Sequence, residues 1–282
     1  MNPADGLRRA LIGRVRRRFN DLERGERPVQ RSTNALFAPD SVAWRVHGDV
    51  TSMMVGGIAA LLVEMLHPLA LGGVWDHSNV ANDMAGRLRR TARFIAVTTF
   101  GHRDDAIAAI ERVRTIHSQV QGTLTDGTSY RADDPALLAW IHVAGSLCFL
   151  DSWRRYGQPG LSHADQDRYF AEVAVVARML GADPVPTSRA EAEGLAQHFR
   201  PQLRADDRTR QFRRLVLEAP PQSLTEAPLQ RLLMIAAVDL MPDYAREMHC
   251  LRPVIIAQPA VRAATLGLAG TLRWAFASGP RP

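Results

Sequence analysis

The sequence predicts an all-α protein. Apolar residues recur every three to four positions in most segments, as they do on the buried face of an amphipathic helix. Alternating β-branched runs bounded by turn residues, which are typical of strands, are nearly absent. Proline, glycine and aspartate residues lie where the apolar periodicity stops, and they divide the chain into helices of ordinary length.

The expected helices follow from this periodicity in chain order. They span 3–24, 41–47, 50–66, 83–99, 103–121, 134–156, 163–181, 188–203, 207–217, 226–239, 242–249 and 254–276. Pro68 is expected to end the third helix, and Gly72-Gly73 to open a turn. Asp134-Pro135 begins the helix over 134–156, because aspartate caps backbone N–H groups and proline is tolerated at the first helical position.

Length and apolar content favour one large domain. The chain has 282 residues, of which 46% are hydrophobic, so it can bury a substantial core. We expect a basic N-terminal helical arm over 1–30 and a single domain over 31–282. The most apolar runs are interrupted by Glu64, His142 or Asp239, which argues against a transmembrane helix. The chain has only two cysteines, and no apolar signal segment follows the N-terminal arginines, so we expect a cytoplasmic protein.

All basic residues are arginines, and the net charge is +6. Such a bias is typical of a GC-rich genome, and no zinc-finger spacing, RNP motif or basic aromatic strand indicates nucleic-acid binding. The basic first twenty residues favour a solvated arm or helix, with peripheral contact to an anionic membrane as the alternative. No feature of the sequence indicates an oligomeric state.

Three histidines lie in or beside apolar helical segments: His67, His117 and His142. A single histidine of this kind is usually a core residue that a neighbour hydrogen-bonds, and the alternative is a ligand for a buried group. None has a histidine partner four residues away, so a zincin-type metal site is not indicated.

Arginines form a second pattern near these histidines. Arg87, Arg90 and Thr91 lie at i, i+3 and i+4 of one predicted helix, and Arg114 lies one turn before His117 on the next. Both helices could therefore offer cations to an anionic group at the edge of an apolar cavity. The alternative is a solvated face whose arginines pair with Asp83 or Glu111. Asp104-Asp105 and Asp133-Asp134 stand at helix starts, where carboxylates cap the helix.

A longer set of residues resembles a known family, namely latex-clearing protein and fungal MpaB, which are haem-dependent oxygenases. The set is His47-Gly-Asp, Gly56-Gly57, Leu61-Leu62, His67-Pro, Gly73-Val, Asp76-His-Ser78, Arg87, Arg90-Thr91, Phe100-Gly101, Val113, His117, Val120, Gly122, Tyr130, Asp134-Pro135 and Trp140-Ile-His142. The resemblance covers about 44–145, with weaker agreement through Tyr169, Glu172, Leu180-Gly181 and the segment from Leu240 to Arg246.

The resemblance implies a globin-like helical core with additional helices that holds one haem b. It implies that His117, three residues after Arg114, is the iron ligand. Because Arg114 stands one turn earlier, we expect it to anchor a haem propionate by charge-assisted hydrogen bonds. The Arg-x-x-Lys-Thr motif of the distal side in latex-clearing protein matches Arg87, Arg90 and Thr91, and His142 matches the later histidine.

Two positions depart from the latex-clearing pattern. Arg90 replaces a lysine that can bind iron, and its guanidinium is always protonated, so we expect an open or water-bound distal side. Arg90 would then either polarise bound dioxygen or pair with a propionate. The family's general base is a glutamate shortly before the arginine motif, but 69–86 contains no glutamate, and Glu64, Asp76 and Asp83 are the only carboxylates nearby.

The sequence therefore leads to three hypotheses of function. The first, which the resemblance favours, is a haem oxygenase that acts with O2 on a hydrophobic isoprenoid-like or natural-product substrate, with oxidative cleavage of a C=C bond as the candidate reaction. The second is a non-catalytic helical protein that binds haem or lipid. The third is a structural helical domain in which His117 is a core residue.

Overall fold

The fold is all-α, as the sequence predicts. The computed structural model describes residues 3–20, 25–221, 223–252 and 257–277. The helices up to the hairpin are α1 (Pro3–Phe19), α2 (Val42–His47), α3 (Val50–Glu64), α4 (Pro68–His77), α5 (Met84–Phe100) and α6 (Arg103–His117). Those after it are α7 (Pro135–Tyr156), α8 (His163–Leu180), α9 (Arg189–Phe199), α10 (Asp207–Leu217), α11 (Ala227–Leu240), α12 (Asp243–Met248) and α13 (Gln258–Phe276). The predicted helix ends over 21–24 and 254–256 lie outside the described residues.

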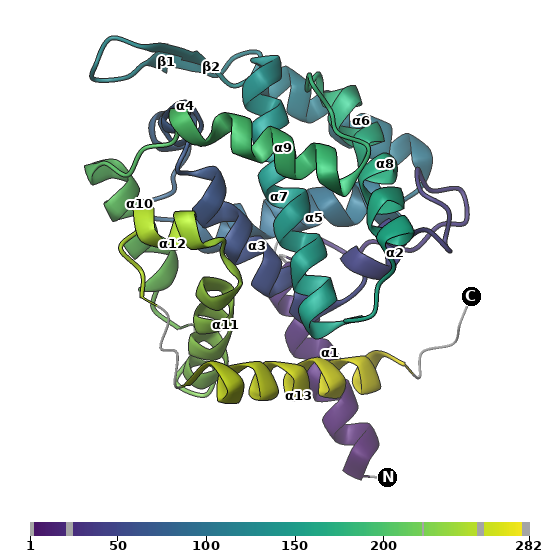
Figure 1. The fold of residues 1–282 in the computed structure, drawn as a ribbon. Helices are drawn as coiled ribbons and strands as arrows, with labels where there is room; N and C mark the ends of the chain where they lie inside the picture. Colours follow the sequence, from purple (N-terminus) through teal and green to yellow (C-terminus); the bar gives the residue numbers. More distant parts are fainter. Residues whose placement is uncertain (1–2, 21–24, 222, 253–256, 278–282) are drawn as a thin grey trace.

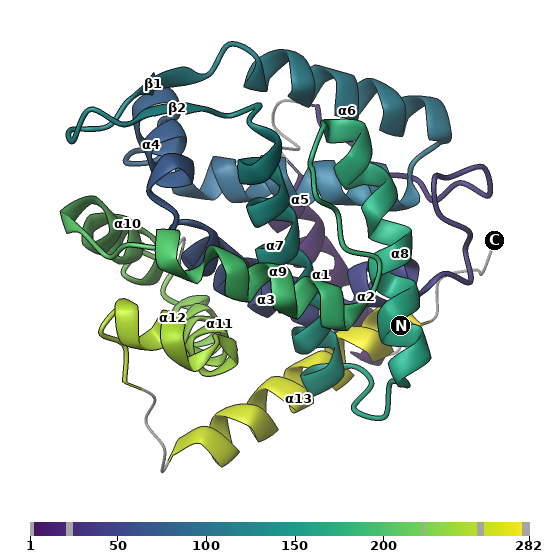
Figure 2. The ribbon, with the colours of Figure 1, turned by 45° about the horizontal axis from the view of Figure 1, so that its top comes forward.

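Helices α3 and α7 pack against each other at the centre of the molecule, and the other helices surround them (Figures 1 and 2). Asp49 caps α3 by accepting a hydrogen bond from the backbone N–H of Ser52, at 2.8 Å. Asp134 caps α7 in the same way, and Pro135 occupies its first turn as expected. The two helices approach closely at Gly56, where an added Cβ would lie 3.0 Å from the carbonyl oxygen of Cys148.

Replacing Gly56 with alanine is expected to destabilise the protein by about 1–3 kcal/mol, because the new methyl group would push two packed backbones apart. Denaturant unfolding followed by circular dichroism measures this change. Gly57→Ala is the matched control, since an added Cβ there meets only the Phe149 ring at 3.6 Å. That variant should be neutral or stabilising, because alanine favours a helix over glycine. Equal unfolding free energies for the two variants would contradict the close approach at Gly56.

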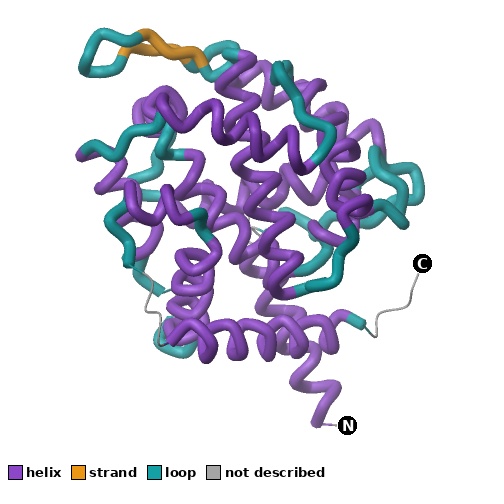
Figure 3. Tube along the Cα trace, viewed as in Figure 1, coloured by secondary structure: helices purple, strands orange, loops and turns teal. Residues whose placement is uncertain are grey.

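The third helix ends before Pro68 as predicted, at Glu64, but the turn predicted at Gly72-Gly73 is wrong. Pro68 is the first residue of α4, and Gly72-Gly73 lie inside that helix. A two-stranded antiparallel hairpin, β1 (Gln121–Thr123) and β2 (Ser129–Arg131), packs on α4, and Figure 3 shows it projecting from the helical body. An added Cβ at Gly72 would lie 2.7 Å from Leu124. The glycines therefore permit close packing against the hairpin and do not form a turn.

Helix α13 lies across one end of the molecule, beside α1 and α11 (Figure 1). Arg8 of α1 donates hydrogen bonds to the carbonyl oxygens of Ala275 and Trp274, at 2.9 and 2.7 Å. The N-terminal helix is thus attached to the C-terminal one.

Within the described residues, α7 is the one helix that is long and apolar enough by itself to cross a bilayer. Helices α3 and α4 meet the same criterion only together, and they are bent by 104°. In α7, 61% of the most apolar window is buried inside the fold, which is typical of a core helix.

Candidate functional site

A cavity of about 810 Å³ lies beside the central helix pair, between α3, α5, α6, α7 and α8. Its walls are mainly apolar and include Ile58, Leu61, Leu88, Ile141, Phe149 and Val173. Its size falls within the range of roughly 300–1,000 Å³ that is usual for small-molecule and cofactor sites. Helix α5 borders the cavity along most of its length, and residues 87–97 of this helix are half-buried or exposed.

The cavity brings together most of the predicted site residues. Arg87, Arg90 and Thr91 line it from α5, His117 from the end of α6, and His142 from α7. Arg114 is different, because it does not line the cavity: its side chain is half exposed and pairs with Glu111 at 3.0 Å. Arg114 thus occupies the solvated helix face that was the alternative interpretation of its pattern.

His117 is the last residue of α6 and is half-buried in the cavity wall. Its ring makes no hydrogen bond within the described part of the chain. Burial lowers the pKa of His117, and Arg87 acts in the same direction while the Asp133 carboxylate opposes it. The imidazole is therefore neutral at neutral pH and has a lone pair for a ligand.

Arg87 is the half-buried cation of the arginine motif. Its Nε is buried and has no hydrogen-bond partner among the described residues. Desolvation lowers the pKa of Arg87, whereas the carboxylate of Glu64 raises it. An unpartnered guanidinium N–H beside an apolar cavity is a group that a bound anionic or polar ligand could satisfy.

Glu64 lies before the segment 69–86, in which the family's general base is expected. It lies at the end of α3 and lines the cavity, where burial raises the pKa of its carboxyl to about 7 and Arg87 partly offsets this effect. An added Cβ at Gly145 would lie 3.1 Å from Glu64 Oε1, so the glycine leaves room for the carboxyl group beside α7. A carboxyl group that titrates near neutral pH can accept or donate a proton at a physiological pH.

The other two nearby carboxylates are engaged elsewhere. Asp83 caps α5 through the N–H of Gly86 at 2.9 Å and pairs with Arg90 at 3.1 Å. Asp76 accepts a hydrogen bond from the Tyr130 hydroxyl at 2.8 Å, beside the hairpin. The Arg90 side chain is 62% exposed and lies at the cavity rim, whereas Arg87 is half-buried.

Polar side chains from α2, α5, α7 and α8 also line the cavity. The Nδ1 atom of His47 lies 2.8 Å from the Thr99 hydroxyl, and its Nε2 atom lies 3.0 Å from the Tyr169 hydroxyl. Ser146 hydrogen-bonds Tyr169 and lies 3.5 Å from His142 Nδ1. Burial lowers the pKa values of His47 and His142 to about 4, so both rings are neutral. Sequence reasoning missed His47 and Tyr169 as cavity residues, although both belong to the family-like residue set.

His67, the third histidine of the sequence analysis, is a core residue. It is buried against Trp140 and Phe199 and lies 3.3 Å from the Gln202 side-chain oxygen. It does not line the cavity.

The described residues contain no group of three or more histidine, cysteine or carboxylate side chains that could hold a bare metal ion. A porphyrin iron needs only one or two axial protein ligands, because the macrocycle supplies the rest. The residues present therefore fit a haem: His117 is one of the neutral histidines of a large apolar cavity, and Arg87 and Arg90 also line it.

The comparison with known families decides the class of protein. The family described as the catalytic domain of ER-bound oxygenase mpaB/B' and rubber oxygenase matches residues 44–274. The chain belongs to this family. As a member of the mpaB/rubber oxygenase family, it carries an oxygenase catalytic domain and is an oxidoreductase. The match includes the cavity residues named above from Glu64 to Tyr169. No curated protein and no solved structure matches the chain.

Proposed function

We propose that this member of the mpaB/rubber oxygenase family binds haem b and oxidises a hydrophobic, isoprenoid-like or natural-product substrate, with cleavage of a C=C bond as the reaction. One observation supports it above the others: a neutral imidazole without a ring partner, His117, lies in the wall of a large apolar cavity. Glutamate and arginine side chains of the same cavity supply the polar chemistry.

His117 would hold the haem iron through a ring nitrogen. Arg90 lies at the exposed rim, where its guanidinium would pair with a propionate by charge-assisted hydrogen bonds. When bound, the haem would supply the activation of O2. Arg114 is left out of the proposed site because it lies on the solvent face.

Glu64 is proposed to take the place of the general base. At a pH above about 7 its carboxylate can accept a proton from a substrate held in the cavity. Arg87 favours the charged carboxylate, which keeps the base available despite its burial. The apolar walls exclude water and hold the hydrocarbon chain of the substrate.

His117→Ala tests the cofactor. Protein reconstituted with haem is expected to show a Soret band, and the variant should lose most of the absorbance and most of its iron content because the one proposed protein ligand is gone. His163→Ala is the control, since that histidine is exposed at the start of α8. An unchanged spectrum in His117→Ala would overturn the assignment of His117 as the ligand.

Oxygen uptake tests the reaction. Anaerobically reduced protein mixed with O2 and a prenylated or polyisoprenoid alkene should consume oxygen and form a new carbonyl product. Haem-loaded protein that binds the alkene without oxygen uptake would instead indicate the non-catalytic haem- or lipid-binding protein. Iron content near zero after growth with a haem precursor would indicate a structural domain.

A further inference from the structure

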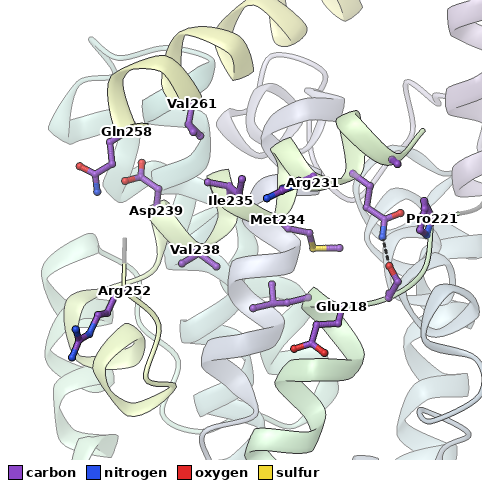
Figure 4. A pocket seen from close by; sticks show the side chains of 14 residues that line it. Glu218, Pro221, Arg231, Met234, Ile235, Val238, Asp239, Arg252, Gln258 and Val261 are labelled. Atoms are coloured by element: carbon purple, nitrogen blue, oxygen red, sulfur yellow. Dashed lines mark hydrogen bonds between the residues drawn. The ribbon is translucent and has the colours of Figure 1, made fainter. Parts of the chain in front are cut away.

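A second cavity of about 440 Å³ lies outside the candidate site, between α10, α11 and α13. We call it the outer groove. Its walls are mostly apolar and include Leu217 from α10. Figure 4 shows Ile235 and Val238 from α11 and Val261 from α13 around the groove. An apolar groove of this volume suits a hydrocarbon chain.

Met234 belongs to the walls of both cavities. Its half-buried side chain on α11 lines both the outer groove and the cavity of the candidate site. Helix α11 packs directly on α3, and α3 forms a wall of the inner cavity. A methionine side chain is unbranched and changes rotamer easily, so this shared wall can yield to a chain that passes from one cavity to the other.

The outer groove also offers a cation. Arg231 lies one turn before Ile235, is exposed, and makes no ion pair or hydrogen bond with its side chain among the described residues. Figure 4 shows Arg231, Met234 and Ile235 close together on α11, with Glu218 on the α10 side of the groove and Arg252 apart from them. Asp239, the other carboxylate of the groove, is neutralised by Arg155 and Arg262. The guanidinium of Arg231 is therefore available to an anionic group.

We propose that the outer groove binds the anionic head of an amphiphilic substrate at Arg231, while the apolar chain passes Met234 into the inner cavity. The proposal rests on the proposed function, because it assigns the substrate class of that same site. The substrate is then a long hydrocarbon chain with one acidic end, such as a carboxylate, and its reacting carbons lie far from the acid.

Calorimetric titration with saturated ligands tests both parts on the purified protein. Arg231→Gln should weaken dodecanoate binding about tenfold and leave 1-dodecanol within about twofold, because one charge-assisted hydrogen bond is lost. Arg112→Gln is the control, since Arg112 is an exposed arginine on α6 outside the groove. Met234→Trp should weaken hexadecanoate about tenfold or more and spare octanoate, which is short enough for the groove alone.

Met248→Trp on α12 controls for the added bulk, because Met248 is half-buried and lines neither cavity. If Met234→Trp folds poorly by circular dichroism, Met234→Phe makes the same test. Equal losses for dodecanoate and 1-dodecanol in Arg231→Gln would overturn the head-group site. Unchanged hexadecanoate binding in a folded Met234 variant would overturn the passage.

Saturated ligands need no turnover, so this result is separable from the reaction. Chain-length and charge dependence without oxygen uptake would support the groove and reject the oxygenase proposal. Oxygen uptake from alkenes, without any dependence of ligand binding on chain length or charge, would support the oxygenase proposal and reject the outer groove as a binding site.

Discussion

Glu64→Gln is expected to lower the rate of substrate oxidation by about 10²–10⁴-fold, the usual contribution of a positioned general base. Glutamine keeps the shape of the side chain but cannot accept a proton. Oxygen uptake under saturating substrate measures the change, with Glu111→Gln as the control because Glu111 is exposed on α6. A variant with wild-type turnover would remove Glu64 from the mechanism.

The pH dependence makes this prediction specific. The base form of Glu64 is the ionised carboxylate, so wild-type activity should rise as the pH increases through about 7. The residual activity of Glu64→Gln should lack this step. A rise near pH 7 that persists in the variant would assign the titration to another group.

The free energy of unfolding should also depend on the titration of Glu64, and this can be measured independently of activity. Burial raises the pKa of Glu64 from 4.5 to about 7, so between these values the folded protein holds a proton that the unfolded chain has released. The contribution of this group to the free energy of unfolding is largest below pH 4.5 and declines as the pH rises to about 7. Glutamine does not titrate, so the unfolding free energy of the variant relative to wild type should increase from pH 5 to pH 8. At pH 8, Glu64→Gln would then lose activity while its unfolding free energy equals or exceeds that of the wild type.

Asp239→Ala is expected to destabilise the fold by about 3 kcal/mol, the second large effect. The Asp239 side chain is 3% exposed and accepts hydrogen bonds from Arg155 of α7 at 2.9 Å and from Arg262 of α13 at 2.9 and 3.2 Å. It therefore connects three helices, and its removal leaves two guanidinium groups near the core without their counter-charge.

Asp243→Ala is the matched control for this prediction. Asp243 also pairs with an arginine, Arg246, but its side chain is 84% exposed. A surface pair contributes little, so the change in unfolding free energy should stay within about 0.5 kcal/mol. Denaturant unfolding of both variants measures the difference. Similar losses in the two would show that burial of Asp239 does not determine its contribution.

Much of the fold could be predicted because local sequence features determine where its helices begin and end. Aspartate and serine caps, proline in the first turn and apolar periodicity act within a few residues, and the helices that they predict are present. Helix α4 and the hairpin were missed because Gly72 and Pro68 have two local meanings, and only the packing of Leu124 and Tyr130 on α4 selects one of them. Tertiary contacts of this kind have no signal in a single sequence.

The candidate site likewise has residues that the sequence predicted and residues that only the structure shows. Arg87, His117 and His142 were found through the family-like residue set, and the structure places all three in one cavity. Glu64 was named only as one of three nearby carboxylates, because it lies outside 69–86. The packing of α3 on α7, and not distance along the chain, decides which carboxyl group enters the cavity. Arg114 was assigned to a propionate because it stands one turn before His117, but its side chain is half exposed and pairs with Glu111.

Helix α5 borders the cavity along most of its length, and its middle turns are only partly buried by the protein itself. Any molecule bound in the cavity would therefore complete the hydrophobic contacts of this helix. Binding and folding are then thermodynamically linked, and the stabilisation grows with the logarithm of ligand concentration. In a cell, this linkage would make the lifetime of the polypeptide against proteolysis depend on the supply of its ligand.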